Sequence, residues 1–211
     1  MLVGGAILPH PPIILPDFAT ERGDEVDQTI EAVRAACRWV AEELRPERIV
    51  ISSPHRGHGF DVPLHFLDEA LGERLPADTL LTDDASYVAY RDLGESLSRR
   101  ESGGAQRVAL IASGDCSHRL RSDGPYGFHP LAPELDRAIV DGVGAADAQA
   151  LLDIDPVVRD EGAECGLRSF VFGLSALRPS RCDVFSYQAP YGVGYLVATI
   201  SVRDASPGAE R

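Results

Sequence analysis

The sequence is short of basic residues, of long apolar runs and of closely paired cysteines. Acidic residues outnumber basic ones by 33 to 20, which gives a formal charge of -13 at pH 7. We therefore expect this solvated acidic surface to have no general attraction to nucleic acid or to anionic membranes. No apolar stretch approaches the ~20 residues that span a bilayer. The four cysteines show no tight paired spacing, and the N-terminus lacks the basic segment and uninterrupted apolar core of a signal peptide, so we expect a reducing, cytoplasmic location.

Two further patterns are missing. None of the glycine clusters follows a strand in a phosphate-cradling arrangement, so no nucleotide site is expected. The chain also shows no internal repeat. With 211 residues, of which 44% are hydrophobic, it can bury one sizeable core. We expect a single domain over residues 1–203 and a disordered tail over residues 204–211, which are small, polar and interrupted by proline.

A strand–helix–strand pattern occupies the first quarter of the chain. Apolar residues recur at three- and four-residue steps over residues 24–44 and predict a helix with one buried stripe. Short apolar runs precede and follow it, at residues 2–8 and 49–53. A helical crossover between two such strands makes them parallel. A third core strand is expected at residues 107–112, after the Ser-Gly-Gly break that ends the preceding helix.

The rest of the chain alternates in the manner of an α/β protein. The loop over residues 122–128, rich in glycine, proline and serine, lies where a lid would form. Asp155 and Pro156 suit an N-cap followed by the first residue of a helix. The other expected elements are a short strand near residues 61–66, helices near residues 85–99, from about 130, near 145–152 and over 164–177, and strands over 182–188 and 193–202.

Three histidines follow the three expected core strands. His10, His55 and His118 each come just after an apolar run. Because parallel strands end at a common edge, and open α/β sheets bind ligands at the carboxyl edge, we expect the three imidazoles to lie near one another. A structural or helix-capping role is the alternative for any one of them taken alone.

These residue types suit a metal site with an acid–base group beside it. Imidazole is a ligand for iron, copper and zinc, and two imidazoles with one carboxylate leave open positions on Fe(II). Prolines flank both His10 and His55, which fixes the chain as it leaves the sheet. A histidine titrates near neutral pH, so His118 beside the metal could take up and return a proton. Asp115 could orient His118 or bind a backbone amide; the alternatives are a capping aspartate and a surface histidine.

Five segments together carry a family resemblance. They read, in chain order, LPHPP, SSPHRGHGF, SGDCSH, GFHPLAPELD and EGAECG. In this order and spacing the chain resembles, from about residue 3 to residue 202, the class III extradiol dioxygenase catalytic-subunit superfamily. This is the LigB-like fold, which also contains the Memo-like proteins. The resemblance implies a central mixed, largely parallel sheet flanked by helices, with a metal site at the carboxyl ends of the strands.

The resemblance also implies roles for particular residues. By position, His10 and His55 match the two histidine ligands of Fe(II), with copper or zinc as alternative metals, and His118 matches the acid–base histidine. Ring-cleaving members supply a glutamate as third ligand, which Glu164 matches. Memo-like members have a cysteine followed by glycine there, which Cys165 matches equally well. A thiolate would favour a softer metal or redox behaviour.

We expect, on this basis, a non-haem Fe(II) dioxygenase of the extradiol type that cleaves a catecholic ring with O2. The alternatives are a Memo-like metal- or redox-binding protein without ring cleavage and a scaffold domain without metal. His58, Arg56 and His129 are candidates for substrate binding, although a solvated loop residue, a surface ion pair and a helix-start residue explain them as well. The compact chain also leaves room for a homo-oligomer whose second subunit completes the pocket.

Overall fold

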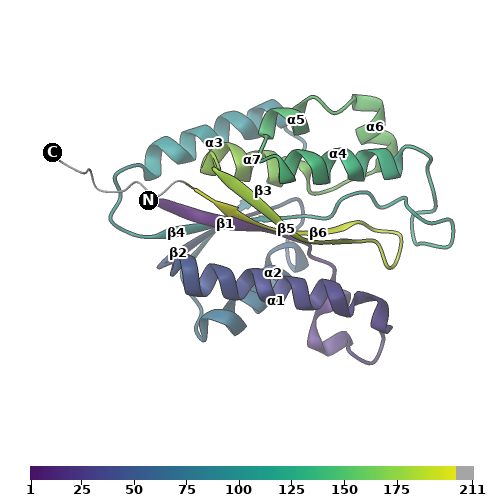
Figure 1. Ribbon diagram of the computed structural model, residues 1–211, viewed down its shortest axis with the longest axis horizontal. Helices are drawn as coiled ribbons and strands as arrows, with labels where there is room; N and C mark the ends of the chain where they lie inside the picture. The colour runs from purple at the N-terminus through teal and green to yellow at the C-terminus, as the bar shows by residue number, and fades with distance from the viewer. Residues whose placement is uncertain (203–211) are drawn as a thin grey trace.

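The computed structural model describes residues 1–202, so the expected tail over residues 204–211 lies outside the described part. These residues form one six-stranded sheet with the spatial order β3-β2-β4-β1-β6-β5 (Figure 1). The strands are β1 (Leu2–Leu8), β2 (Arg48–Ser53), β3 (Ala77–Leu81), β4 (Val108–Ser113), β5 (Arg181–Gln188) and β6 (Tyr195–Ser201). The α-helices are α1 (Asp27–Trp39), α2 (His58–Leu71), α3 (Tyr87–Glu101), α4 (Ala132–Gly144), α5 (Ala148–Leu152), α6 (Pro156–Gly162) and α7 (Leu167–Leu177).

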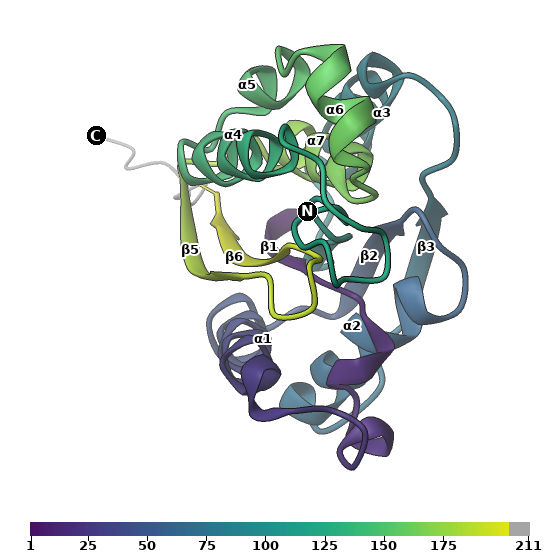
Figure 2. The same cartoon turned by 90° about the vertical axis from the view of Figure 1, so that its right-hand side faces the viewer.

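The sheet is mixed and largely parallel, as predicted. β1, β2 and β3 run parallel with β4 or with each other, and the β5–β6 hairpin adds two antiparallel strands beside β1. The three strands that precede the candidate histidines, β1, β2 and β4, are therefore neighbours. Their carboxyl ends meet at one edge of the sheet, which faces the viewer in Figure 2.

Helices cover both faces of the sheet. α1 and α2 lie on one face, and α3 to α7 lie on the other (Figures 1 and 2). Successive residues of β1 serve the two layers in turn, because side chains alternate along a strand. Ile7 packs with the α7 side of the core, whereas Ala6 and Leu8 pack with the α1 and α2 side. No helix among residues 1–202 has the length and apolar character needed to cross a membrane.

The strand expected near residues 61–66 is wrong, because these residues belong to α2. Their apolar residues fit a helix as well as a strand over so short a run. Val62, Phe66 and Leu67 are buried together at helical spacing, and Pro63 lies inside the helix. The edge strand β3, whose first three residues are exposed, is not predicted from the sequence.

The first long helix is less uniform than its periodicity suggests. Residues 24–44 form a 3₁₀ turn, α1 and a final π-helical turn at Val40–Leu44. Arg45 then adopts a left-handed conformation with φ of 43°. The Arg107 guanidinium donates hydrogen bonds to the Leu44 carbonyl from Nε and Nη2, at 3.0 and 2.7 Å. This arginine therefore satisfies a carbonyl at the end of the helix, where the helix itself offers no donor.

Candidate metal centre and cavity

A cluster of three imidazoles lies at the carboxyl edge of the sheet. His10 follows β1, His55 follows β2 and His58 begins α2. Their ring centroids are 5.2 Å apart for His10 and His55, and 5.4 Å apart for each pair that includes His58. One ring nitrogen from each lies within 4.8 Å of the other two, so the three can hold a metal ion. We call His10, His55 and His58 the histidine cluster.

The start of α2 brings His58 to this cluster. A Cβ atom at position 59 would lie 2.1 Å from Ser53 Oγ, so only glycine lets the helix begin this close to the end of β2. The Ser53 hydroxyl oxygen in turn accepts a hydrogen bond from the His55 backbone N–H at 3.2 Å. Close packing of the two segments thus sets His55 beside His58.

A hydrogen-bonded relay fixes the orientation of the His10 ring. The Ser113 hydroxyl donates to the Gly59 carbonyl at 2.6 Å, so its oxygen is left to accept from His10 Nδ1–H at 2.9 Å. His10 then carries its proton on Nδ1 and presents the lone pair of Nε2 to the cluster. Fixing the tautomer of a ligand in this way is typical of metal-binding histidines.

Pro63 explains why the Gly59 carbonyl is free to accept the hydrogen bond from Ser113. In a regular helix this carbonyl would accept from the N–H of residue 63, but proline has no N–H to donate. Ser113 supplies the missing donor from β4. The proline inside α2 therefore links the helix to the strand and, through Ser113, to His10.

Burial favours the uncharged form of His10 and of His55. The His10 side chain is 2% exposed, and its pKa is lowered to about 3, first by burial and then by the neighbouring His55 and His58. Burial, His58 and His118 also lower the pKa of His55. Neutral imidazoles are the form that binds metal ions.

A second group of possible ligands shares His10 with the cluster. Cys165 Sγ lies 3.7 Å from His10 Nε2, and the Asp115 carboxylate lies 3.8 Å from the same nitrogen. The other Asp115 oxygen accepts from the His10 backbone N–H at 3.1 Å, so this aspartate binds a backbone amide, one of its two expected roles. Burial raises the pKa of Asp115 to about 7 and the pKa of the Cys165 thiol well above its usual value.

Glu164 is directed away from both groups. Its carboxylate accepts from the Tyr87 hydroxyl at 2.9 Å and from the Leu167 backbone N–H at 2.5 Å. The Tyr87 ring is itself held between two guanidinium groups, Arg159 at 4.4 Å and Arg168 at 4.5 Å from the ring centroid. The structure therefore brings Cys165 to His10 and ties Glu164 to α3.

His118 lies in the same cavity and is oriented by the backbone. Its Nδ1 lies 2.7 Å from the Ala163 carbonyl oxygen, and a carbonyl can only accept, so this nitrogen carries the proton and Nε2 has the free lone pair. The Tyr126 ring stands edge-on to His118, with centroids 5.0 Å apart. Burial lowers the pKa of His118. These features leave a neutral imidazole able to accept a proton.

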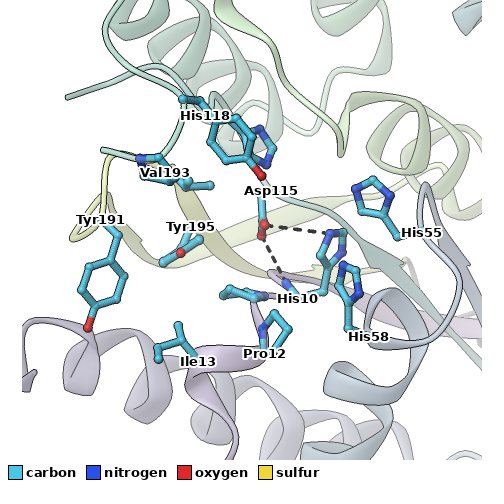
Figure 3. Close-up of a pocket in the computed structure, with 13 residues that line it drawn as sticks. His10, Pro12, Ile13, His55, His58, Asp115, His118, Tyr191, Val193 and Tyr195 are labelled. Carbon is cyan, nitrogen blue, oxygen red and sulfur yellow. Dashed lines mark hydrogen bonds and ion pairs between the residues drawn. The ribbon is translucent and has the colours of Figure 1, made fainter. Parts of the chain in front are cut away.

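The cavity has a volume of about 330 Å³ and contains His10, His55, His58, Asp115 and His118 in its lining. Figure 3 shows the histidine cluster on one side and Tyr191, Val193 and Ile13 on the other. Tyr126 and Tyr195 also line it. The cavity thus combines possible metal ligands, one further imidazole and an aromatic wall.

Two expected substrate-binding residues are elsewhere. Arg56 is exposed and does not line the cavity. His129 also lies outside the lining: its Nε2 is 3.4 Å from the Glu161 carboxylate, and its Nδ1 accepts from the Leu131 backbone N–H before α4. His58 is not predicted as a ligand from the sequence, although its three-residue spacing from His55 is a signal. No sequence pattern indicates the role of Ser113, because a serine at the end of a strand has no specific meaning by itself.

One family model matches more than half of the chain. Residues 56–198 match the family described as the catalytic LigB subunit of aromatic ring-opening dioxygenase. A curated relative, Protein CA_C1420 of Clostridium acetobutylicum, is 24% identical over a 265-residue alignment that covers 92% of this chain and 56% of the relative. This chain therefore spans about half the length of that relative. A solved structure, the uncharacterized protein JW3007 from Escherichia coli K12, is 12% identical with a TM-score of 0.58, covers 94% of this chain and 100% of its own, and supports the fold alone.

Proposed function

Because this chain belongs to the LigB family of aromatic ring-opening dioxygenase subunits, we propose that it opens a catechol ring with O2 at a metal ion. In this proposal the ion is held by His10, His55 and His58, whose nitrogens are close enough to share it. Imidazole ligands suit iron, zinc and copper, and Fe(II) is the metal we propose for this reaction. When bound, the ion would hold the two substrate hydroxyls and lower their pKa.

The observation that carries the proposal is the placement of a free imidazole nitrogen in the same cavity as the cluster. His118 is fixed by the Ala163 carbonyl and has its unprotonated Nε2 available. It would accept a proton from a catechol hydroxyl and return it as the ring opens, the work of a general acid–base group. Tyr126, packed against His118, would cover the reacting ring and help to exclude water.

Oxygen uptake tests this function directly. Protein loaded anaerobically with Fe(II) should consume O2 with at least one member of a broad catechol panel. His118→Gln should lower kcat by about 100-fold or more, in the usual range for general acid–base groups, with the iron content unchanged. His65→Gln, a change on α2 outside the cavity lining, is the matched control. Failure of the whole panel to support O2 uptake would contradict the proposal.

A second candidate is a metal- or redox-binding protein without ring cleavage. The observation that favours it lies just before α7, where Cys165 and not Glu164 approaches His10. Glu164 instead binds Tyr87. Here His10, Asp115 and Cys165 would hold a softer ion.

Metal retention separates the two candidates. If the histidine cluster holds the ion, His58→Gln should lower metal affinity sharply and Cys165→Ser should not. The second candidate predicts the reverse order. Both candidates predict that Glu164→Gln retains the metal, because the Glu164 carboxylate contacts neither group of possible ligands. A sharp loss of metal in Glu164→Gln would instead support Glu164 as the third ligand.

A further inference from the structure

The cavity contains no permanently charged cation. All 20 basic residues of the chain are arginines, since the sequence has no lysine. Among residues 1–202, no arginine lines the cavity. Its one acidic member, Asp115, is buried beside His10. A negatively charged substituent on a bound molecule would therefore find no arginine or lysine partner in the lining.

The arginines closest in sequence to lining residues are held by other groups or lie outside. Arg119, next to His118, donates to the carbonyl and the carboxylate of Glu161. Arg22 donates to the carbonyls of Ile14 and Leu15. Arg121 pairs with the Asp123 carboxylate through two hydrogen bonds and also donates to the Pro190 carbonyl. Arg56, one of the candidates for substrate binding from the sequence, is exposed outside the lining.

The two sides of the cavity would orient a bound catechol ring. With its hydroxyls at the histidine cluster, a catechol turns its opposite edge toward the wall made by Tyr191, Val193 and Ile13 (Figure 3). Val193 is 6% exposed, so a carboxylate against it would lose water. A buried charge without a partner is strongly disfavoured, whereas a hydrogen or methyl group at the same place gains from apolar contact.

The volume of the cavity also limits the size of the substrate. A volume of about 330 Å³ is at the lower end of the range for ligand cavities, roughly 300–1,000 Å³. Such a space suits a single aromatic ring with a small substituent.

We propose that the cavity selects an uncharged single-ring catechol and rejects catechols that carry a ring carboxylate. The inference rests on the proposed function, and it assigns the uncharged wall of Tyr191, Val193 and Ile13 as the element that sets specificity.

Direct binding tests this without turnover. Zn(II)-loaded protein is titrated by calorimetry with 4-methylcatechol and with 3,4-dihydroxybenzoate, which differ mainly in charge at the far edge of the ring. The acid should bind about 100-fold more weakly, because its carboxylate loses water without gaining a cation. Equal affinities would overturn the inference and leave the proposed function standing. Binding of neither compound would count against both.

A charge introduced into the wall gives an independent test. Ile13 is half-buried, so Ile13→Arg can add a guanidinium to the wall with little disturbance of the core, and Ile13→Met is the neutral control of similar length. Ile13→Arg should raise the affinity for 3,4-dihydroxybenzoate by about 10-fold or more through a charge-assisted hydrogen bond, and Ile13→Met should not. If circular dichroism shows both variants folded and the affinities match, the assignment of this wall is wrong.

Discussion

Replacement of Ser113 by alanine tests the relay that orients His10. The change removes the donor to the Gly59 carbonyl and the acceptor for His10 Nδ1–H, both buried. A buried polar group left without a partner costs about 1–3 kcal/mol, so the two together should lower the free energy of unfolding by roughly 2–6 kcal/mol. Loss of such a partner also lowers metal affinity by about 10–100-fold.

Ser52 provides a matched control for this change. It lies on β2, is as buried as Ser113, and its hydroxyl has no hydrogen-bond partner among the described residues. Ser52→Ala should therefore change the free energy of unfolding by less than about 1 kcal/mol, with metal affinity unaffected.

Urea unfolding and metal titration measure the two effects. Pro63→Ala extends the test, because its new N–H would compete with Ser113 for the Gly59 carbonyl and should weaken metal binding even where the fold is retained. Equal behaviour of Ser113→Ala and Ser52→Ala in both assays would refute the relay.

Three further predictions concern other parts of the molecule. Tyr87→Phe should lower the free energy of unfolding by about 1–3 kcal/mol in urea titrations, because the buried Glu164 loses a donor, whereas a large loss of metal would connect this anchor to the site. Gly94→Ala should destabilise by about 1–3 kcal/mol despite the better helix propensity of alanine, because the new Cβ would lie 2.5 Å from the Phe172 carbonyl oxygen; a rise in thermal midpoint would contradict this packing. For the metal-free protein, stability should fall as pH decreases through 6.5, since folded His10, with a pKa of about 3, stays neutral while the unfolded chain takes up a proton. By pH 5, protonation of His10 in the unfolded chain should lower the free energy of unfolding by about 2 kcal/mol. This loss should be absent in His10→Gln.

The core strands, their parallel direction and the convergence of the histidines at one edge could be predicted from the sequence. Apolar runs and helical spacing fix which segments are strands and which are crossovers, and parallel strands end at one edge. These two rules alone predict that His10 and His55 lie near each other. The same reasoning failed for residues 61–66, where a short apolar run around Pro63 fits either period.

The sequence could not decide what happens at the start of α7. Glu164 and Cys165 are adjacent, and the direction of each side chain depends on contacts from distant elements. Tyr87, from α3, binds the glutamate, and the cysteine then lies next to His10. Arg56 is similar: its position beside His55 suggested a contact with substrate, but the turn into α2 leaves it outside the cavity lining.

The proposed site requires that His10 and His55 bind one ion together. Metal content is measured on protein loaded anaerobically with Fe(II) and then desalted, with wild type, His55→Gln and His65→Gln compared side by side. We expect about one ion per chain in wild type and in His65→Gln. His55→Gln removes a metal ligand and should lower the affinity by roughly 10-fold or more, at least as much as the loss of a group that orients a ligand. Full retention of iron by His55→Gln, or none in wild type, would contradict the proposed site.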